Sequence, residues 1–276
     1  MYDLISVGDS TLDTFVQVND ATKLCTAHKK ECFLCFSWAD KIPITSLAQK
    51  TAGNAANVAV GASRLGLKTA IYTVVGDDET GWKLKQAFEK DGISLDYVAL
   101  DKKNPSNYSV VLTFQGERTI LVYHQQRVYA LPDLKPTQWI YYTSMGKGYE
   151  KLQSQLIRYL KNYPETKLAF NPGTHQMQNG LKGMREVLKR CEIIFLNKEE
   201  TERIVGSATD MFGLLQKLKA TGPKIAVITD GTKGSYAYDG KEAWFLEAFP
   251  EKSKEKTGAG DSFATGFTTG LHHALP

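Results

Sequence analysis

The sequence predicts an α/β fold in which a mainly parallel central sheet is covered by helices on both faces. Short apolar runs of strand length alternate along the chain with longer amphipathic runs of helix length. Serial alternation of this kind is typical of parallel strands that are connected by helices. The chain has 276 residues, enough to bury a substantial core, and we expect residues 1–276 to form a single domain.

The first elements establish the alternation. The apolar run Tyr2–Val7 predicts a short buried strand, and Lys68–Val75 predicts a second strand. Between them, Ala55–Leu65 follows the helical pattern and stops at Gly66. A further amphipathic helix is expected at Trp82–Lys90.

The same alternation resumes in the second half of the chain. Strands are predicted at Trp139–Thr143, Lys167–Phe170, Glu192–Leu196, Ile225–Thr229 and Ser235–Tyr238, and helices at Tyr149–Tyr163, Leu181–Cys191, Glu199–Val205 and Met211–Ala220. These elements extend the parallel sheet and cover it.

Two segments interrupt this rhythm, residues 14–47 and about residues 105–125. The first segment lacks helical periodicity. In the second, Tyr108–Phe114 and Thr119–Tyr123 are typical of a hairpin around Gln115–Arg118. We expect both segments to form a small β excursion from the α/β body, and excursions beside a ligand cleft often act as lids.

Composition and charge exclude several classes of protein. Hydrophobic residues make up 42% and charged residues 23%, which excludes a wholly disordered chain. The net charge of +4 comes from scattered basic residues, so no nucleic-acid partner is expected. No apolar run reaches the ~18 residues of a membrane span, and Asp3 stands where a secretory signal would be basic. We therefore expect a cytoplasmic protein with no membrane partner.

A cluster of potential metal ligands lies in the first irregular segment. Cys25, His28, Cys32 and Cys35 follow the spacing C-x2-H-x3-C-x2-C, which is tighter than the paired spacing of most zinc sites. A zinc site and a dithiol that oxidises are two interpretations. Because no secretory signal precedes the cluster, we favour a third, partly buried free thiols.

The segment Thr257-Gly258-Ala259-Gly260-Asp261 carries the strongest chemical signal. Its glycines permit a tight turn, and a helix is predicted to begin near Asp261. Free N–H groups at a helix start form an anion site, and a carboxylate there is placed to accept a proton beside a bound phosphate. The segment matches neither the Walker A loop nor the dinucleotide fingerprint. Taken alone, it is equally consistent with a surface turn and an N-capping Asp.

Polar residues also gather near the first two strands. Gly53, Asn54 and Asn57 stand at a helix start, and the two Asn, three residues apart, share a helix face. Asn offers a donor and an acceptor, which suits recognition of hydroxyl groups. Asp9 and Asp13 follow the first strand, where open α/β sheets bind ligands. Helix capping by Asn54 and turn roles for both Asp remain alternatives.

Together these motifs resemble the ribokinase family, the phosphofructokinase B-type (PfkB) carbohydrate kinases. The resemblance rests on four ordered segments: Gly53–Asn57 continuing through Arg64–Gly66 to Val75–Asp78 and Gly81, Asn197–Glu200, Thr229–Gly234, and Thr257–Phe263. It implies a Rossmann-like three-layer α/β/α ribokinase fold, a small β-sheet lid and, by way of that lid, a homodimer.

The resemblance also implies a reaction, ATP- and Mg2+-dependent phosphotransfer to a hydroxyl group of a sugar or sugar-like molecule. Asp261 would be the general base, and the N–H groups of Gly258, Ala259 and Gly260 would hold the developing phosphoryl charge. The residues that match the family's substrate side are Asp13, Gly53, Asn54 and Asn57.

Further matches concern the nucleotide and its metal ion. The nucleotide side is matched by Asn197, Thr229, Gly231 and Gly234, and Mg2+ is expected at Glu200, through water. A solvated acidic helix start and a β-turn are the structural alternatives for these two segments. Asn171, just after a strand, is expected near the phosphate path, whereas His175 is expected to be an ordinary surface residue.

Two departures from the family pattern stand out. Glu255 occupies the place of an Asp that is often tied to a monovalent cation; it marks the candidate K+ site, although Lys256 brings a competing positive charge. The chain also ends at Pro276, where family members continue with helices that wall the adenine pocket. We therefore expect those C-terminal helices to be missing.

The acceptor itself cannot be read from these motifs. Asn54 stands where ribokinases often carry Lys, so ribose is not favoured over a ketohexose, a 2-keto-3-deoxy sugar acid or a nucleoside. Phe33, Phe36 and Trp38 would stack on a base or form the core of the lid. The leading interpretation is a carbohydrate kinase; an adenosine-type nucleoside kinase and a non-catalytic ligand-binding member are the alternatives.

Overall fold

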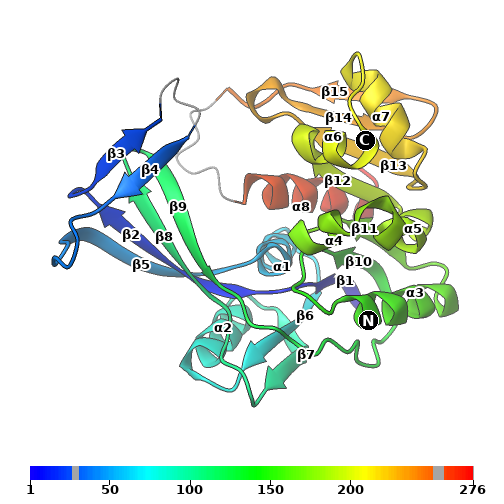
Figure 1. The fold of residues 1–276 in the computed structure, drawn as a ribbon. Helices are drawn as coiled ribbons and strands as arrows, with labels where there is room; N and C mark the ends of the chain where they lie inside the picture. The colour runs from blue at the N-terminus through cyan, green and yellow to red at the C-terminus, as the bar shows by residue number, and fades with distance from the viewer. Residues whose placement is uncertain (27–30, 251–257, 276) are drawn as a thin grey trace.

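The computed structural model describes residues 1–26, 31–250 and 258–275, and within them a nine-stranded sheet runs through the body (Figure 1). Its strand order is β15-β14-β13-β12-β11-β10-β1-β6-β7. The strands are β1 (Tyr2–Val7), β6 (Thr69–Gly76), β7 (Ser94–Asp101), β10 (Thr137–Tyr142), β11 (Lys167–Phe170), β12 (Ile193–Asn197), β13 (Ile225–Thr229), β14 (Ser235–Tyr238) and β15 (Ala243–Leu246). Strand β14 pairs antiparallel with both β13 and β15, and the other pairs among these described strands are parallel, so the mainly parallel sheet is confirmed.

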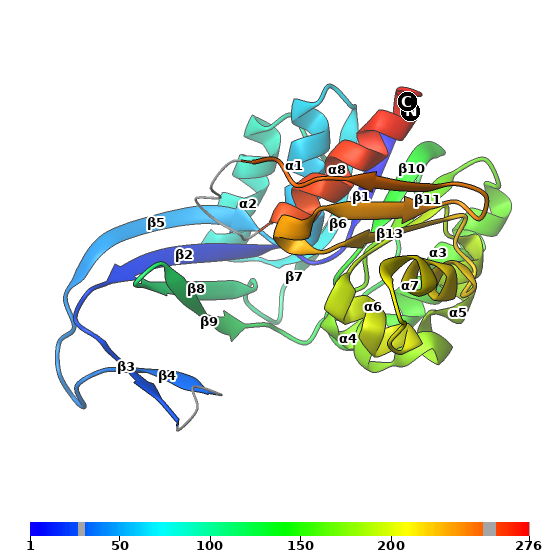
Figure 2. The ribbon, with the colours of Figure 1, turned by 90° about the horizontal axis from the view of Figure 1, so that it is seen from above.

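Helices cover both faces of this sheet (Figure 2). One face carries α1 (Asn54–Arg64), α2 (Glu79–Lys90) and α8 (Ala259–His272), and the other carries α3 (Glu150–Asn162), α4 (Thr174–Gln178), α5 (Gly180–Arg190), α6 (Lys198–Val205) and α7 (Met211–Lys219). On the first face, Val58 of α1 and Ala264 of α8 are buried with Leu4 of β1. On the second, Leu156 and Leu218 are buried with Ile140. The three-layer α/β/α arrangement is therefore confirmed.

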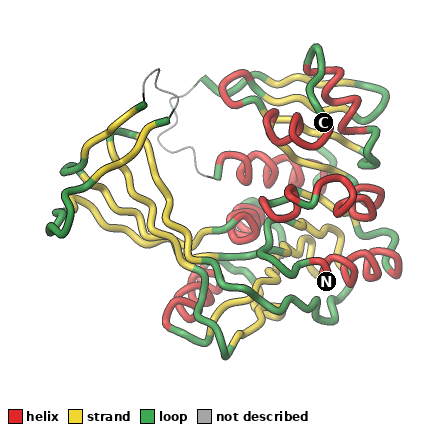
Figure 3. Tube along the Cα trace, in the orientation of Figure 1, coloured by secondary structure: helices red, strands yellow, loops and turns green. Residues whose placement is uncertain are grey.

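A second sheet projects from the body, and we call it the lid sheet (Figure 3). Its strand order is β5-β2-β8-β9, formed by β2 (Thr11–Val18), β5 (Ile44–Ala52), β8 (Tyr108–Phe114) and β9 (Glu117–Tyr123). Strand β2 pairs antiparallel with β5 and parallel with β8. The two irregular segments of the sequence thus combine in one small sheet.

Three elements were not anticipated from the sequence. Strand β7 lies at one edge of the large sheet, and Asp96 interrupts its apolar pattern. Strand β15 lies at the opposite edge with all four residues exposed, so burial gives it no periodic signal. Helix α4 has only five residues, too few to show helical periodicity.

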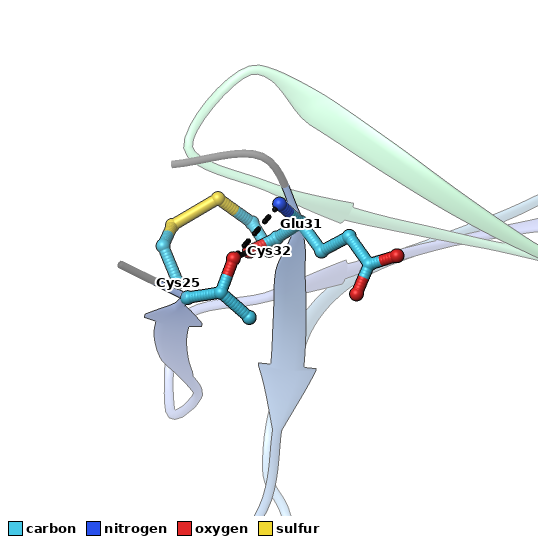
Figure 4. The surroundings of a disulfide bond; sticks show 4 residues. Cys25, Glu31 and Cys32 are labelled. Atoms are coloured by element: carbon cyan, nitrogen blue, oxygen red, sulfur yellow. Dashed lines mark hydrogen bonds between the residues drawn. A yellow bond between two sulfur atoms is a disulfide. The ribbon is translucent and has the colours of Figure 1, made fainter. Parts of the chain in front are cut away.

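The cysteine cluster lies at the far end of the lid sheet, in a hairpin of β3 (Thr22–Cys25) and β4 (Cys32–Cys35). Cys25 and Cys32 face each other across the hairpin with their Cα atoms 4.0 Å apart, and they form a disulfide (Figure 4). The interpretation as free thiols is wrong for these two residues, because the hairpin register brings them together. The free-thiol interpretation is correct for Cys35, which is free and partly exposed.

The zinc interpretation finds no support in the part of the chain that the structure describes. No group of three or more potential ligands gathers there, and His28 lies outside the described residues. No helix within the described ranges is both long and apolar enough to cross a membrane.

Candidate active site

The principal cavity, of about 410 Å³, opens at the carboxyl ends of the parallel strands. Strands β1 and β10 are neighbours, with β6 and β7 continuing the sheet on one side and β11 to β13 on the other. A reversal of strand order at such a point leaves a crevice, and α/β sheets commonly bind ligands there. The predicted site residues that line it are Asp13, Gly53, Asn54, Asn57, Asn171, Asn197, Glu200, Thr229, Gly258, Gly260 and Asp261.

Asp261 lies in the first turn of α8, where its side chain is almost fully buried. The amide Nδ2 of Asn57 donates a hydrogen bond to its Oδ2 at 2.7 Å. Burial raises the pKa of the Asp261 carboxyl, and hydrogen bonds from Asn57 and Asn54 offset only part of that rise. A carboxyl with a raised pKa is a better proton acceptor than a solvated one.

The start of α8 is open to the cavity. Gly258 is the N-cap in the left-handed conformation, with φ of 76°, and no side chain among the described residues caps the first turn. The N–H of Ser262 makes the first intrahelical bond, to the Gly258 carbonyl oxygen, so the preceding N–H groups have no partner within the helix, and such groups are suited to bind an anion. A Cβ on Gly260 would meet nothing within 4 Å. The helix begins at Ala259, so the interpretation of Asp261 as an N-cap is wrong.

Gly53 brings the start of α1 against the segment that follows β1. It is the N-cap of α1 with φ of 100°, and a Cβ there would lie 2.6 Å from the Asp9 carbonyl oxygen. Glycine is therefore required on both conformational and steric grounds. Because Gly53 is the N-cap, capping by Asn54 is wrong; Asn54 and Asn57 both face the cavity.

Asp9 and Asp13 line the wall near the lid sheet, each with 7% of its surface exposed. The hydroxyl of Tyr129 and the N–H of Gly146 both donate to Oδ2 of Asp9, each at 2.8 Å. Asp13 lies within β2, so a turn role for it is wrong. Burial raises the pKa of both carboxyls above the usual range.

Asn197 and Glu200 form a reciprocal cap at the start of α6. The Glu200 N–H donates to Oδ1 of Asn197 at 2.8 Å, and the Asn197 N–H donates to Oε2 of Glu200 at 2.9 Å. The structural alternative for this segment, an acidic helix start, is therefore present, and both residues also line the cavity. One carboxylate and one amide suit Mg2+, because this ion keeps several of its waters when bound.

Of the remaining predicted residues, some line the cavity, some lie outside it, and some are not among the described residues. Thr229 ends β13 opposite Asn197 of β12 and lines the cavity, whereas Gly231 begins a 3-10 turn outside the cavity and Gly234 follows that turn. Asn171 donates its Nδ2 to the Phe195 carbonyl oxygen at 2.8 Å. Glu255 and Thr257 lie outside the described residues.

Other residues lining the cavity were missed. Ser144 follows β10 as Asn171 follows β11, so the rule that drew attention to Asp9 applies to it as well. His124 directly follows β9 and also lines the cavity. Ser109 carried no sequence signal, because its place depends on the pairing of β8 with β2.

The aromatic residues of the lid do not contribute to the cavity. Phe33, Phe36 and Trp38 are absent from its lining. Trp38 is 96% exposed and Phe33 55% exposed, so the interpretation as lid core is wrong.

The match to a known family defines the chain as a kinase that transfers a phosphoryl group to an alcohol. The chain belongs to the pfkB family of carbohydrate kinases, whose profile matches residues 35–276. The use of ATP follows from membership of this family.

Comparisons with individual proteins agree with this assignment. A nucleoside kinase of Methanothermobacter thermautotrophicus is 24% identical over 273 residues, covering 96% of this chain and 81% of that protein. A fructokinase of Klebsiella pneumoniae is 28% identical over 245 residues, covering 83% and 80%. The solved structure of Arabidopsis thaliana ribokinase complexed with ribose and ATP matches with a TM-score of 0.77 and 19% identity, covering 100% of this chain and 87% of that one. This last similarity shows the shared fold.

Proposed function

We propose that the protein transfers the γ-phosphoryl group of ATP to a hydroxyl group, a primary alcohol, of a sugar or sugar-like small molecule. The observation that carries the proposal is the position of Asp261, a buried carboxyl with a raised pKa that lines the cavity, at a helix start that no described side chain caps. The fructokinase and nucleoside kinase relatives support it through their acceptors.

In this mechanism Asp261 takes the proton of the acceptor hydroxyl while that oxygen attacks the γ-phosphorus and ADP leaves. The N–H groups of Gly258, Ala259 and Gly260 hold the charge that develops on the transferred phosphoryl group. Asn57 keeps the carboxylate of Asp261 in place. The acceptor is held by Asp13, Gly53, Asn54 and Asn57.

On the nucleotide side, Asn197, Thr229, Gly231 and Gly234 contact ATP, with Asn171 near the phosphates. Glu200 would hold Mg2+ through water, and that ion neutralises phosphate charge when it is bound. Glu255, the candidate K+ ligand, is not among the residues described, and K+ has no part in this mechanism.

A nucleoside is the second candidate acceptor. The observation in its favour is the nucleoside kinase relative, whose match covers 96% of this chain. A panel of sugars and nucleosides offered in competition distinguishes the two. A ligand-binding protein without activity is disfavoured, because binding alone does not require a buried carboxyl beside an anion site.

The test is ADP release from Mg-ATP with a panel of sugars, sugar acids and nucleosides. We expect one acceptor to give turnover, and Asp261→Asn to lower kcat by ~10^2–10^4-fold. Asp133, which is exposed and outside the cavity, provides the matched control as Asp133→Asn. Full activity of Asp261→Asn with the same acceptor would overturn the assignment of the base.

A further inference from the structure

The hairpin of β3 and β4, which carries three of the cysteines, belongs neither to the large sheet nor to the lid sheet. Among the described strands, its two strands pair only with each other. All four residues of β3 are exposed, and in β4 only Leu34 and Cys35 are partly buried. A two-stranded hairpin that buries so little apolar surface is marginally stable in water. The Cys25–Cys32 disulfide therefore supplies much of the restraint that keeps this hairpin closed.

This disulfide is open to attack from solvent. Cys25 and Cys32 are both exposed. Cys32 also lines a small cavity of about 240 Å³ that the hairpin shares with β8 and β9, where Leu112 and Phe114 form part of the wall. Exposed disulfides are the ones that thiols reduce readily, whereas the structural disulfides of secreted proteins resist reduction. The position of this bond is thus typical of a disulfide that opens and closes.

The hairpin is also the connection between two strands of the lid sheet. Strands β2 and β5 pair antiparallel as far as Val18 and Ile44, and the hairpin lies in the chain between these two residues. The disulfide shortens the connection, and a shorter connection lowers the entropy cost of holding the two strand ends together. Order in the hairpin and order at this end of the lid sheet are therefore coupled.

The third cysteine of the hairpin, Cys35, is unable to exchange with the disulfide while β4 keeps its strand form. It lies three residues after Cys32, a span of about 10 Å in an extended strand, and a disulfide requires Cα atoms less than about 7 Å apart. Because side chains alternate along a strand, Cys35 also points to the opposite face. Cys191 is fully buried, and burial raises the pKa of its thiol, so it stays protonated and unreactive. One pair of cysteines can therefore cycle.

We propose that Cys25 and Cys32 form a redox site that a dithiol reduces, and that reduction releases the hairpin and loosens the adjoining end of the lid sheet. A thiolate of the dithiol attacks one sulfur of the bond, and the other cysteine leaves as a thiolate. The second thiol of the reductant then displaces the protein from this mixed disulfide, so that the protein gains two electrons and two protons and the dithiol becomes a disulfide. Exchange with glutathione disulfide restores the bond. Neither cysteine lines the active-site cavity, so the proposal stands apart from the proposed kinase function.

Alkylation of the native protein, read by mass spectrometry, counts the free thiols. Before reduction we expect label at Cys35 alone, and after treatment with dithiothreitol under native conditions we expect label at Cys25, Cys32 and Cys35. Cys191 should stay unlabelled in both states. Reoxidation with glutathione disulfide should restore the first result. A protein that labels at all three hairpin cysteines before reduction, or a bond that dithiothreitol opens only after unfolding in urea, would overturn the proposal.

Trypsin shows which bond forms on reoxidation. Cleavage after Lys30 separates Cys25 from Cys32, whereas Cys32 and Cys35 stay in one peptide. The reoxidised protein should therefore give two tryptic peptides that the Cys25–Cys32 bond links. A sample in which most of the bond joins Cys32 to Cys35 would overturn the pairing.

Amide hydrogen exchange measures the release of the hairpin. Reduction should accelerate exchange of the β3 and β4 amides about 50- to 100-fold, the factor that loop-closure entropy gives for a loop of this size. The amides near Val18 should also exchange faster, by a smaller factor, and those of β1 should not change. Unchanged exchange in the hairpin after complete reduction would overturn the role of the bond in holding it closed.

Two variants supply the matched comparison. Cys35→Ser removes a partly exposed thiol without touching the bond, so its hairpin should exchange like that of the wild type and still respond to dithiothreitol. The double variant Cys25→Ser/Cys32→Ser should exchange rapidly with or without dithiothreitol, and its body should fold normally because both positions are exposed. A response to dithiothreitol that persists in the double variant, or that disappears in Cys35→Ser, would overturn the assignment of the redox pair.

Discussion

The amide of Asn57 donates a hydrogen bond to the carboxylate of Asp261 over 2.7 Å, although 204 positions separate the two residues in the chain. This contact joins α1 to α8, which lie side by side on one face of the large sheet. It aligns the proposed base and shifts its pKa downward, against the upward effect of burial.

Replacing Asn57 with Ala should therefore change the pH dependence of the reaction. Loss of its hydrogen bond raises the pKa of Asp261 further, so a larger fraction of the base is protonated at low pH. We expect the acid limb of the kcat profile to move to higher pH and kcat below that limb to fall roughly tenfold. Steady-state rates across the pH range measure this. Asn162→Ala, at an exposed helix end, is the control, and an unshifted acid limb would contradict the prediction.

Replacement of Gly53, at the start of α1, should strongly lower the stability of the fold. Gly53→Ala combines a positive φ with a Cβ placed 2.6 Å from the Asp9 carbonyl oxygen, whereas Gly66→Ala has a positive φ and open space. We expect Gly66→Ala to cost ~1–2 kcal/mol of unfolding free energy and Gly53→Ala clearly more, because the main chain must also move. Urea denaturation of both variants compares them, and equal losses would show that the close approach is unimportant.

Gly260 should matter for activity and hardly at all for stability. A Cβ there meets nothing within 4 Å, so Gly260→Ala should leave the unfolding free energy unchanged or raise it by up to ~1 kcal/mol. Its methyl group would enter the cavity beside the proposed phosphoryl position and lower kcat/KM for ATP about tenfold or more. Gly266→Ala lies in the same helix, exposed and outside the cavity, and should behave like the wild type. Full activity of Gly260→Ala would argue against the anion site.

A buried ion pair near the lid sheet should make stability depend on pH. The fully buried side chain of Arg127 donates to Oδ2 of Asp101 at 2.8 Å and to the Asn104 carbonyl oxygen at 3.2 Å. Burial acts to raise the pKa of Asp101, but hydrogen bonds from Asn104 and Arg127 outweigh it and hold this pKa well below its usual range.

A carboxyl whose folded-state pKa is lowered stabilises the protein above its unfolded pKa, and this stabilisation is lost as the pH falls towards the folded value. We expect the unfolding free energy to decline below about pH 4. Asp101→Asn should lose ~3–5 kcal/mol near neutral pH, since it leaves a buried guanidinium without its counter-charge. Chemical denaturation at several pH values measures both effects; a loss below ~1 kcal/mol, the scale of an exposed pair, would contradict the prediction.

Local apolar runs were sufficient to predict much of the body. The bounds of β1, β11 and β13 were predicted as the structure has them, because each strand contains three or four consecutive buried residues. The exposed β15 lacked that signal. The Cys25–Cys32 disulfide was not predicted, because the register of β3 against β4 cannot be derived from the cysteine spacing alone.

For the site, the sequence located residues that stand at the ends of strands and the starts of helices. Asp261 and Asn57 were found in this way, yet nothing local indicated that they would contact each other across 204 positions. The surroundings of Asp9 and Asp13 depend on packing by Tyr129, Gly146 and the lid sheet, and such long-range packing leaves no periodic signal in the sequence.

One continuous stretch of chain passes from the large sheet into the lid sheet, with β1 ending at Val7 and β2 beginning at Thr11. Asp9 is anchored to the body through Ser144, while Asp13 sits in the lid sheet between Lys50 of β5 and Ser109 of β8. A compound held by both carboxyl groups would span the joint and brace one sheet against the other. Binding of the acceptor would then also restrain the movement of the lid sheet against the large sheet.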